Sequence, residues 1–206
     1  MSHYFHTPDK PLVTHEFGAT VFGNDLTFTA ANGVFSGHRL DLGTSVLLRE
    51  VDPPESGRVL DLGCGVGTIA VGIAVASPGV TVDAVDVNDR ALELTTINSR
   101  RHGVADRVRA LRPEAVEPDA SYAEIWSNPP IRIGKAALHE LLLTWLPRLT
   151  PDGAAYLVVG KNLGGDSLQR WLTDQGHPTE RVASAKGFRV LRTTRGHCAT
   201  GERQTP

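Results

Sequence analysis

Two stretches of the sequence combine residue types and spacing that suit chemistry on a small ligand. The first, VLDLGCGVGTIA at residues 59–70, carries Gly63, Gly65 and Gly67 within five positions. Glycines let backbone amides approach a ligand that side chains would keep away, and the helix that follows adds unpaired N–H groups at its N-terminus. Asp86 comes nineteen residues after Gly67, and its carboxylate suits the two hydroxyls of a ribose. The pair predicts a site for a nucleoside-containing ligand.

The spacing of these glycines argues against a dinucleotide. The nicotinamide fingerprint is G-x-G-x-x-G. Here the third glycine arrives one position early, in GCGVG, and Thr68 occupies the position of the expected glycine. The alternative interpretation is a turn that merely requires glycines, followed by an acid that caps the next helix.

The second stretch is SNPPIRIG, at residues 127–134. Two prolines fix the backbone and remove two N–H groups. The acceptors that remain are the side-chain carbonyl of Asn128 and the backbone carbonyl of Pro129, and two acceptors suit a planar NH₂ group. We expect Asn128, Pro129, Pro130 and Ile131 to form a catalytic turn that fixes an exocyclic amino nitrogen. The alternative is a rigid turn that only ends a strand.

Both turns require strands that end at one edge of a sheet. Strands are expected at residues 58–61, 80–86, 107–111, 122–127, 154–159, 179–183 and 188–192, with helices up to about 77, at 89–102, 135–149 and 167–175. This alternation predicts an α/β, Rossmann-like, doubly wound sheet of seven mostly parallel strands. The last two strands are too close for a helical crossover and should pair antiparallel at an edge. The strand before Asn128 should border the strand before Gly63, which places both turns at one cleft.

A lead-in of residues 1–54 precedes the domain at 55–195. Its residues 15–35 alternate as a β-hairpin does, around Gly23-Asn24-Asp25, and a short helix is expected within 40–51, before the boundary at Asp52-Pro53-Pro54. We expect the lead-in to pack on the cleft. Residues 196–206 have no apolar pattern and are expected to be disordered.

Composition limits the function classes. The 206 residues are 40% hydrophobic and 21% charged, which allows a full core, and the net charge of −2 excludes a globally basic nucleic-acid binder but not a local basic face. No apolar run suits a membrane helix and no signal peptide is visible. Two cysteines suit a reducing, cytoplasmic compartment, and the spacing of the histidines predicts no metal site.

DLGCGVG followed by a strand-end acid resembles motif I and the ribose acid of the class I S-adenosylmethionine-dependent methyltransferases. The resemblance implies S-adenosyl-L-methionine as cofactor and S-adenosyl-L-homocysteine as product. It assigns Asp61 to the methionine amino group, Asp86 to the ribose, Val87 to the adenine face and Glu114 to the adenine amino group. The cofactor-binding residues implied in this way are Asp61, Gly63, Cys64, Gly65, Gly67, Asp86, Val87, Glu114 and Asn128.

NPPI resembles the motif of amino-methylating enzymes, whose substrates are adenine N6, guanine N2, cytosine N4 or a glutamine amide. Together with NGVFS at 32–36, LDLG at 40–43 and GFRV at 187–190, it resembles the small-domain methyltransferases that modify guanine N2 of small-subunit ribosomal RNA, in a short single-domain bacterial form. Ile131 and Arg132 stand where better-known members carry an aromatic residue and His. The resemblance implies ribosomal RNA or a small-subunit particle as partner. The lack of a long apolar run predicts no membrane partner, and the oligomeric state is left open.

Two residues near the cleft have open roles. Phe35 either stacks on a flipped base, replacing the missing aromatic, or is a core residue. Arg132 either binds a nucleotide phosphate or is a solvated turn residue. The alternative functions are methylation of a protein glutamine or of adenine N6, and a non-catalytic scaffold with a methyltransferase-like fold.

Overall fold

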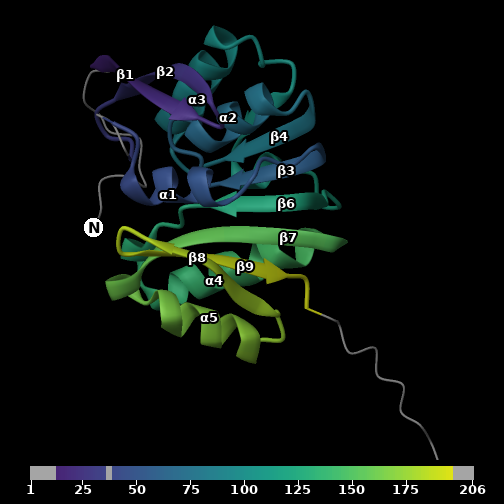
Figure 1. Cartoon of the computed structure of the whole chain (residues 1–206). Helices are drawn as coiled ribbons and strands as arrows, with labels where there is room; N and C mark the ends of the chain where they lie inside the picture. The colour runs from purple at the N-terminus through teal and green to yellow at the C-terminus, as the bar shows by residue number, and fades with distance from the viewer. Residues whose placement is uncertain (1–12, 36–38, 197–206) are drawn as a thin grey trace, which may run out of the picture.

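The computed structural model describes residues 13–35 and 39–196 (Figure 1). The strands are β1 (Thr14–Val21), β2 (Asn24–Ala31), β3 (Ser56–Leu62), β4 (Gly79–Val85), β5 (Val108–Leu111), β6 (Tyr122–Ser127), β7 (Leu149–Gly160), β8 (Thr179–Ala185) and β9 (Phe188–Thr194). The α-helices are α1 (Leu42–Glu50), α2 (Thr68–Ala76), α3 (Asp89–Arg101), α4 (Lys135–Trp145) and α5 (Gly165–Asp174). Short 3-10 helices are η2 (Pro113–Ala115), η3 (Ile131–Ile133), η4 (Leu146–Arg148) and η5 (Lys161–Leu163).

A seven-stranded sheet forms the centre of the molecule, in the order β5-β4-β3-β6-β7-β9-β8. β3 pairs in parallel with β4 and with β6, and parallel pairing continues to β5 on one side and β7 on the other. β9 runs antiparallel to both β7 and β8. The expected Rossmann-like sheet with an antiparallel pair at one edge is therefore confirmed. The strand that reverses direction is β9, one position in from the edge.

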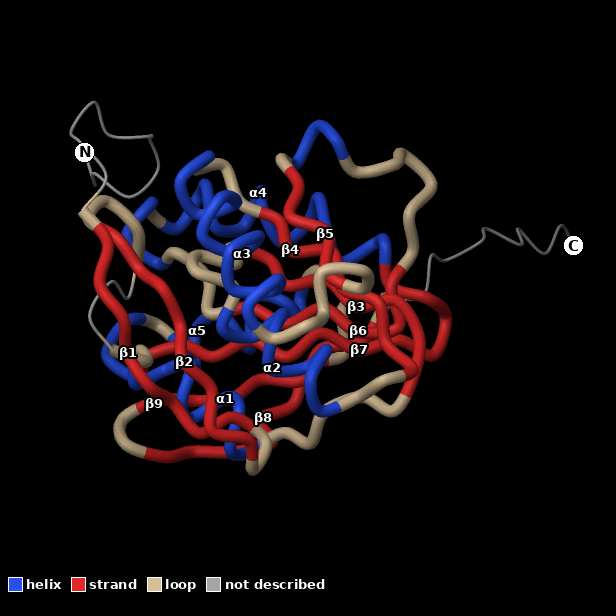
Figure 2. The backbone as a smooth tube through the Cα atoms, turned by 90° about the horizontal axis from the view of Figure 1, so that it is seen from above, coloured by secondary structure: helices blue, strands red, loops and turns tan. Residues whose placement is uncertain are grey.

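The lead-in contributes a separate two-stranded hairpin and a helix. β1 pairs antiparallel with β2, and Val21 faces Asn24 across the turn. The predicted hairpin is confirmed, but its turn lies at Phe22 and Gly23, whose φ angles of 47° and 77° are both positive, as a type I′ turn requires. Seen from above, β2 is the strand of the hairpin nearer to α2 and α3 (Figure 2).

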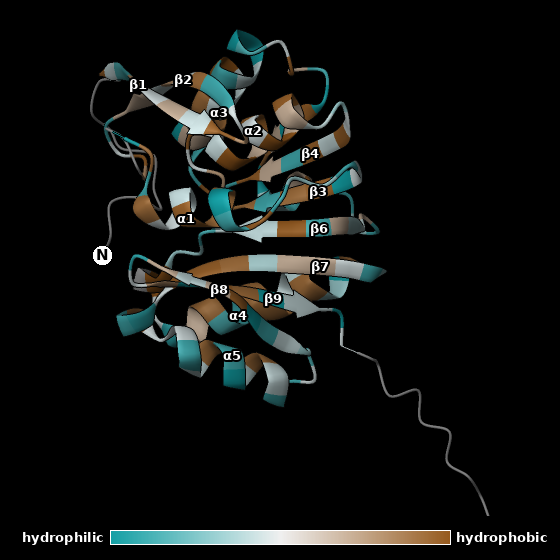
Figure 3. Cartoon of the chain, viewed as in Figure 1, coloured by the Kyte–Doolittle hydropathy of each residue, from teal (hydrophilic) through white to brown (hydrophobic). Residues whose placement is uncertain are grey.

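Two apolar layers enclose the sheet. One face carries α1, α2 and α3 with the hairpin above them, and its core joins lead-in residues such as Val21 and Val46 to sheet residues such as Val59. The other face carries α4 and α5. The central strands β6 and β7 carry apolar segments, whereas α5 shows both polar and apolar residues (Figure 3). α4 ends at Trp145, short of the expected Leu149, because Pro147 lies in the 3-10 turn η4 and β7 begins directly after it.

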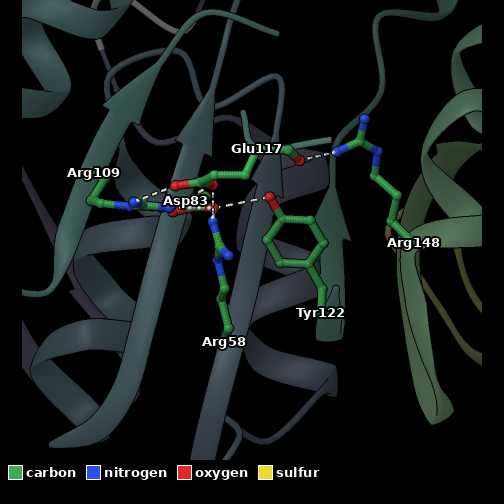
Figure 4. A network of polar contacts seen from close by, with 6 residues as sticks. All are labelled: Arg58, Asp83, Arg109, Glu117, Tyr122 and Arg148. Atoms are coloured by element: carbon green, nitrogen blue, oxygen red, sulfur yellow. Dashed lines mark hydrogen bonds and ion pairs between the residues drawn. The ribbon is translucent and has the colours of Figure 1, made fainter. Parts of the chain in front are cut away.

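A polar network replaces a helix over the β4–β5 side of the second face (Figure 4). Asp83 of β4 is buried, and its carboxylate accepts hydrogen bonds from Arg58, Arg109 and the hydroxyl of Tyr122. Glu117, in the loop before β6, bonds both arginines in turn. A buried carboxylate needs such partners, since an unpaired charge in the interior is strongly unfavourable.

The predicted boundary at residues 52–54 falls between the end of α1 and the start of β3. Most of the predicted tail, residues 197–206, lies outside the described residues, as does Cys198. Among the helices of the described part, none is long and apolar enough to cross a membrane.

Candidate active site

The glycine turn joins β3 to α2 in a backbone conformation that other residues rarely adopt. Gly63, Gly65 and Gly67 have φ angles of 80°, 57° and 79°. The N–H groups of Gly63 and Cys64 both donate to the carbonyl of Val85, at 2.8 and 3.1 Å, which fixes the turn against the end of β4. A Cβ added at Gly63 would meet no atom within 4 Å. The turn is therefore anchored on one side and open on the other.

Asp61 lies directly below this turn, within β3. It is fully buried, and its Oδ2 accepts a hydrogen bond from the N–H of Ala70 in the first turn of α2, at 3.0 Å. Its Oδ1 is buried and has no hydrogen-bond partner among the described residues. Burial raises the pKa of Asp61 from its ordinary value of 3.8 to about 7, against the effect of the Ala70 hydrogen bond and with a further contribution from the charge of Asp86. The Oδ1 of Asp61 can therefore accept a hydrogen bond or contact a positive charge.

Asp86 follows β4 and closes the other side of the turn. Its Oδ2 accepts the N–H of Gly65 and its Oδ1 accepts the N–H of Asn88, both at 3.0 Å. Burial raises its pKa, while these backbone hydrogen bonds act in the opposite direction. A carboxylate offers about four acceptor positions, so two remain for ligand hydroxyls. Val87, the next residue, is 45% exposed, which leaves an apolar surface beside the carboxylate.

Asn128 follows β6, and its amide is held in one orientation. Its Nδ2 donates to Asp41 Oδ1 at 2.7 Å and to Thr44 Oγ1 at 3.0 Å. Asp41 is the N-cap of α1 and also accepts the N–H of Thr44. Because both Nδ2 hydrogens are used, the Oδ1 of Asn128 is the atom left for a ligand, and among the described residues it accepts no hydrogen bond.

The prolines after Asn128 form the turn expected from the sequence, with one difference. The carbonyl of Pro129 accepts the N–H of Ile131 at 2.8 Å, so one of its two lone pairs is used inside the turn. Ile131 is partly buried against the core under α4. Arg132 lies in η3, but its side chain is outside the described part of the structure.

The two turns meet at one pocket. β3 and β6 are parallel neighbours, and Ser127 Oγ donates to the carbonyl of Leu62 at 2.6 Å, which ties their carboxyl ends together. A small pocket above these ends is lined by residues from the glycine turn, α1, α2 and the NPP turn: Phe35, Leu40, Asp41, Thr44, Gly63, Cys64, Gly65, Val66, Thr68, Ile69 and Asn128. Phe35 is 47% exposed there.

Two expected cofactor residues lie differently from the rest. Cys64 is buried, its Sγ lies 3.5 Å from Thr95 Oγ1, and burial raises the pKa of its thiol well above the ordinary value. It contributes its backbone and a small packing volume rather than a thiolate. Glu114 lies in η2 after β5, with its side chain 69% exposed and 3.7 Å from the guanidinium of Arg112.

Several supporting residues escaped sequence reasoning because they act across long chain separations. Buried Asn98 of α3 bonds both the N–H and the carbonyl of Thr29 in the hairpin, and donates to the carbonyl of Val66 in the glycine turn. Asn88 donates to the carbonyl of Gly33. α3 thereby holds the glycine turn and the lead-in in one arrangement. The sequence held one sign of this support. Thr95 and Asn98 are polar residues three positions apart on one face of α3, and both are buried.

Comparison with known proteins gives a consistent result. The family model for the methyltransferase small domain matches residues 25–192. The uncharacterized protein YbxB of Bacillus subtilis (strain 168) is 30% identical over 199 residues, which cover 93% of this chain and 98% of that protein. Ribosomal RNA small subunit methyltransferase C of Acinetobacter baumannii (strain AYE) is 38% identical over 129 residues, but these cover only 38% of that protein and 61% of this chain.

Among solved structures, the T. thermophilus 16S rRNA N2 methyltransferase RsmC, in complex with AdoMet and guanosine, matches with a TM-score of 0.79. The identity is 23%, and the match covers 91% of this chain and 52% of that chain. At this identity the likeness establishes the fold.

Proposed function

The chain belongs to the methyltransferase small domain family of S-adenosylmethionine-dependent methyltransferases, and from this premise we propose that it methylates the N2 amino group of a guanine in small-subunit ribosomal RNA. The observation that carries the proposal is the shared pocket, where a turn suited to the cofactor faces an amide oxygen suited to an amino group. The relatives named as ribosomal RNA methyltransferases, one of them solved with AdoMet and guanosine, support the choice of substrate.

The residues on the cofactor side fit S-adenosylmethionine. The unpartnered, buried Oδ1 of Asp61 suits the methionine ammonium group, and the remaining acceptor positions of Asp86 suit the ribose hydroxyls. The open space at Gly63 leaves room for the methionine part of the ligand, and exposed Val87 offers an apolar surface for the adenine. When bound, the cofactor supplies a methyl group on a positively charged sulfur.

The residues on the acceptor side orient the nitrogen. We assign the Oδ1 of Asn128 and the second lone pair of the Pro129 carbonyl to the two N2 hydrogens of guanine. With both hydrogens held, the N2 lone pair can point along the line of an in-line displacement, for which positioning supplies most of the rate. Bound S-adenosylmethionine would supply its methyl group to N2 and would leave as S-adenosylhomocysteine, and loss of one N2 proton to solvent would then remove the positive charge from N2. Asn128 and Pro129 are neutral acceptors and stabilise this charge.

Phe35 completes the proposed substrate side. A base must leave its stack to reach a cofactor bound in a protein pocket. Since Ile131 supplies no aromatic surface next to Asn128, we assign the stacking surface to Phe35, whose ring is partly exposed at the pocket.

The test is methylation of ribosomal RNA from a strain that lacks the gene. The purified protein and S-adenosylmethionine are incubated with this RNA, as naked RNA and as small-subunit particles, and the nucleosides are mapped by mass spectrometry. We expect one N2-methylguanosine, absent from the deletion strain and restored by the protein. A methyl group on adenine or on a ribosomal protein would replace the proposed substrate by one of the alternatives. A protein that does not bind S-adenosylmethionine would be a scaffold.

A further inference from the structure

Three lysines stand at successive strand ends beside the proposed active site. Lys135 begins α4, after the 3-10 helix η3 and Gly134 that follow the NPP turn, Lys161 follows β7, and Lys186 lies in the turn between β8 and β9. They are the only lysines in the part of the chain that the structure describes, and all three are exposed. In the sheet order, β6, β7 and β9 are consecutive neighbours.

These strand ends lie at the same edge of the sheet as the pocket. The turn from β8 to β9 and the helix α1 lie at the end of the sheet to which β6 points (Figure 1). The N–H of Lys161 donates to the carbonyl of Gly187 at 2.8 Å, so the segment after β7 and the turn that holds Lys186 are directly bonded. At a spacing of about 4.8 Å between strands, the row formed by the three lysines extends roughly 10–15 Å outward from Asn128.

The charges of this row are not balanced by acids. Every ion pair formed within residues 13–35 and 39–196 involves an arginine, and none involves these lysines. Beside the row, Arg181 and Arg189 share the single carboxylate of Asp166, at 3.6 and 3.3 Å, which adds further positive charge. The whole chain carries a net charge of −2. The row is therefore a local concentration of positive charge on a protein that is negative overall.

We propose that Lys135, Lys161 and Lys186, named here the lysine row, bind the phosphates of the RNA strand that leads into the pocket. This inference rests on the proposed function, since it assigns the approach path of that RNA. Lysines suit this task because phosphate contacts fix the position of a strand without reading its sequence. An exposed row of lysines needs no specific base, so it fits a strand from which one guanine is turned into the pocket.

The test compares two double variants of equal charge change. Lys161→Ala with Lys186→Ala removes two members of the row and spares Lys135, the lysine nearest in sequence to the NPP turn. Arg100→Ala with Arg170→Ala is the control, because both arginines are exposed, neither has an acidic partner among the described residues, and they belong to α3 and α5, not to the row. The probes are naked small-subunit ribosomal RNA and small-subunit particles, both from the deletion strain.

The readout is the dissociation constant for each probe over a range of salt concentrations. Each lost phosphate contact on a single strand reduces the slope of log K against log salt by about 0.7, so the lysine variant should lose about 1.4 from the slope and bind roughly tenfold more weakly at low salt. The control variant should keep the wild-type slope. Thermal melting and affinity for S-adenosylmethionine should not change in either variant.

An unchanged slope in the lysine variant overturns the inference, and so does an equal loss in the control. A wild-type protein that binds neither probe also overturns it. If the wild-type protein methylates guanine N2 while the lysine variant keeps its slope, the RNA path is wrong and the proposed function stands. If the lysine variant loses its slope but no methylguanosine forms, the proposed function fails on its own.

Discussion

Asp61 shows how a single buried side chain can report on cofactor binding. Its carboxylate is fully buried, and its Oδ1 has no hydrogen-bond partner among the described residues. Burial raises its pKa to about 7. Because the unfolded chain loses this proton near pH 4, the folded state binds the extra proton, and its free energy of unfolding falls as pH rises from about 4 to 7. A bound positive charge beside Asp61 favours the ionised form and releases the proton.

We predict that affinity for S-adenosylmethionine falls as pH drops below 7. With a pKa of about 7, the ionised fraction of Asp61 changes about tenfold between pH 8 and pH 6, and the dissociation constant should rise by about that factor. Calorimetric titration in buffers of different ionisation enthalpy measures both the affinity and the proton released. Asp61→Asn should bind more weakly at pH 8 and show little pH dependence. A wild-type affinity that is constant across this range would refute the role of Asp61.

Thr44 tests whether the orientation of the Asn128 amide matters. It accepts one of the two Nδ2 hydrogen bonds and lies outside the NPP turn. We predict that Thr44→Val, which keeps the shape but removes the acceptor, lowers kcat about tenfold, equivalent to a hydrogen bond of about 1.4 kcal/mol, and leaves KM for S-adenosylmethionine unchanged.

Thr44→Ser supplies the matched control, since it restores the acceptor and should recover most of the lost turnover. A purely structural role of Thr44 would instead lower the melting temperature and affect both kinetic constants together. A low kcat in Thr44→Val together with a nearly normal kcat in Thr44→Ser would therefore identify Thr44 as a positioning residue.

At the scale of residues, local sequence could place Asp86 and Asn128 at the sheet edge but could not predict the residues that hold Asn128 in position. Asp86 and Asn128 each follow an apolar strand directly, so their place at the sheet edge could be predicted. Asp41 and Thr44 lie 87 and 84 residues from Asn128 along the chain. No local pattern predicts a hydrogen bond across such a separation, because it depends on how α1 packs on the finished sheet.

At the scale of elements, the hairpin and α2 depend on close approach. Gly72, in the middle of α2, leaves no room for a Cβ beside Val21 of the hairpin, whose Cγ1 it would contact. Alternating residues predicted the hairpin, but its turn was placed wrongly because Phe22, not a glycine or asparagine, adopts the positive φ. The contact between Val21 and Gly72 shows how closely the hairpin packs on α2.

We predict that Gly72→Ala destabilises the protein by up to about 2 kcal/mol. Alanine favours a helix by about 1 kcal/mol over glycine, but forcing a methyl group against buried Val21 costs about 1–3 kcal/mol. Chemical denaturation measures the difference. In the double variant with Val21→Ala the added methyl group finds space, so the two changes should be less destabilising together than the sum of their separate effects. Additive effects would show that the two residues do not press on each other.

The polar network around Asp83 gives a second element-scale prediction. Hydrogen bonds from Arg109 and Arg58 lower the pKa of Glu117 to about 2. Because the pKa of Glu117 is lower in the folded state than in the unfolded chain, ionised Glu117 stabilises the folded state at pH values above about 4.5. This contribution is lost as the pH falls toward 2. Glu117→Gln should therefore be less stable than the wild type at pH 7, with a gap that narrows at pH 3. Asp119→Asn, an exposed change in the same loop, is the control. A gap that does not depend on pH would exclude this explanation.

At the scale of the whole molecule, the sheet order places the proposed cofactor site and the proposed substrate site at one edge. β3 and β4 present the cofactor turn, β6 presents the amino-group turn, and β7 and β9 extend the same edge to the lysine row. This chain spans nearly all of YbxB but about a third of methyltransferase C from A. baumannii. The neighbouring positions of β3 and β6, the antiparallel pair at the edge and the family could be predicted from the sequence, whereas the proposed route of the RNA depends on charges that only the folded edge brings together.

The most direct test of the central claim is calorimetric titration of S-adenosylmethionine into the wild type, Asp86→Ala and Asn128→Ala, with single-turnover methylation measured in parallel. If the glycine turn binds the cofactor and the NPP turn binds the amino group, Asp86→Ala should weaken cofactor binding at least tenfold, since it removes the proposed ribose contact. Asn128→Ala should bind the cofactor with nearly wild-type affinity and lose most of its methyl transfer. Equal losses of cofactor affinity in both variants, or full methyl transfer by Asn128→Ala, would contradict this account.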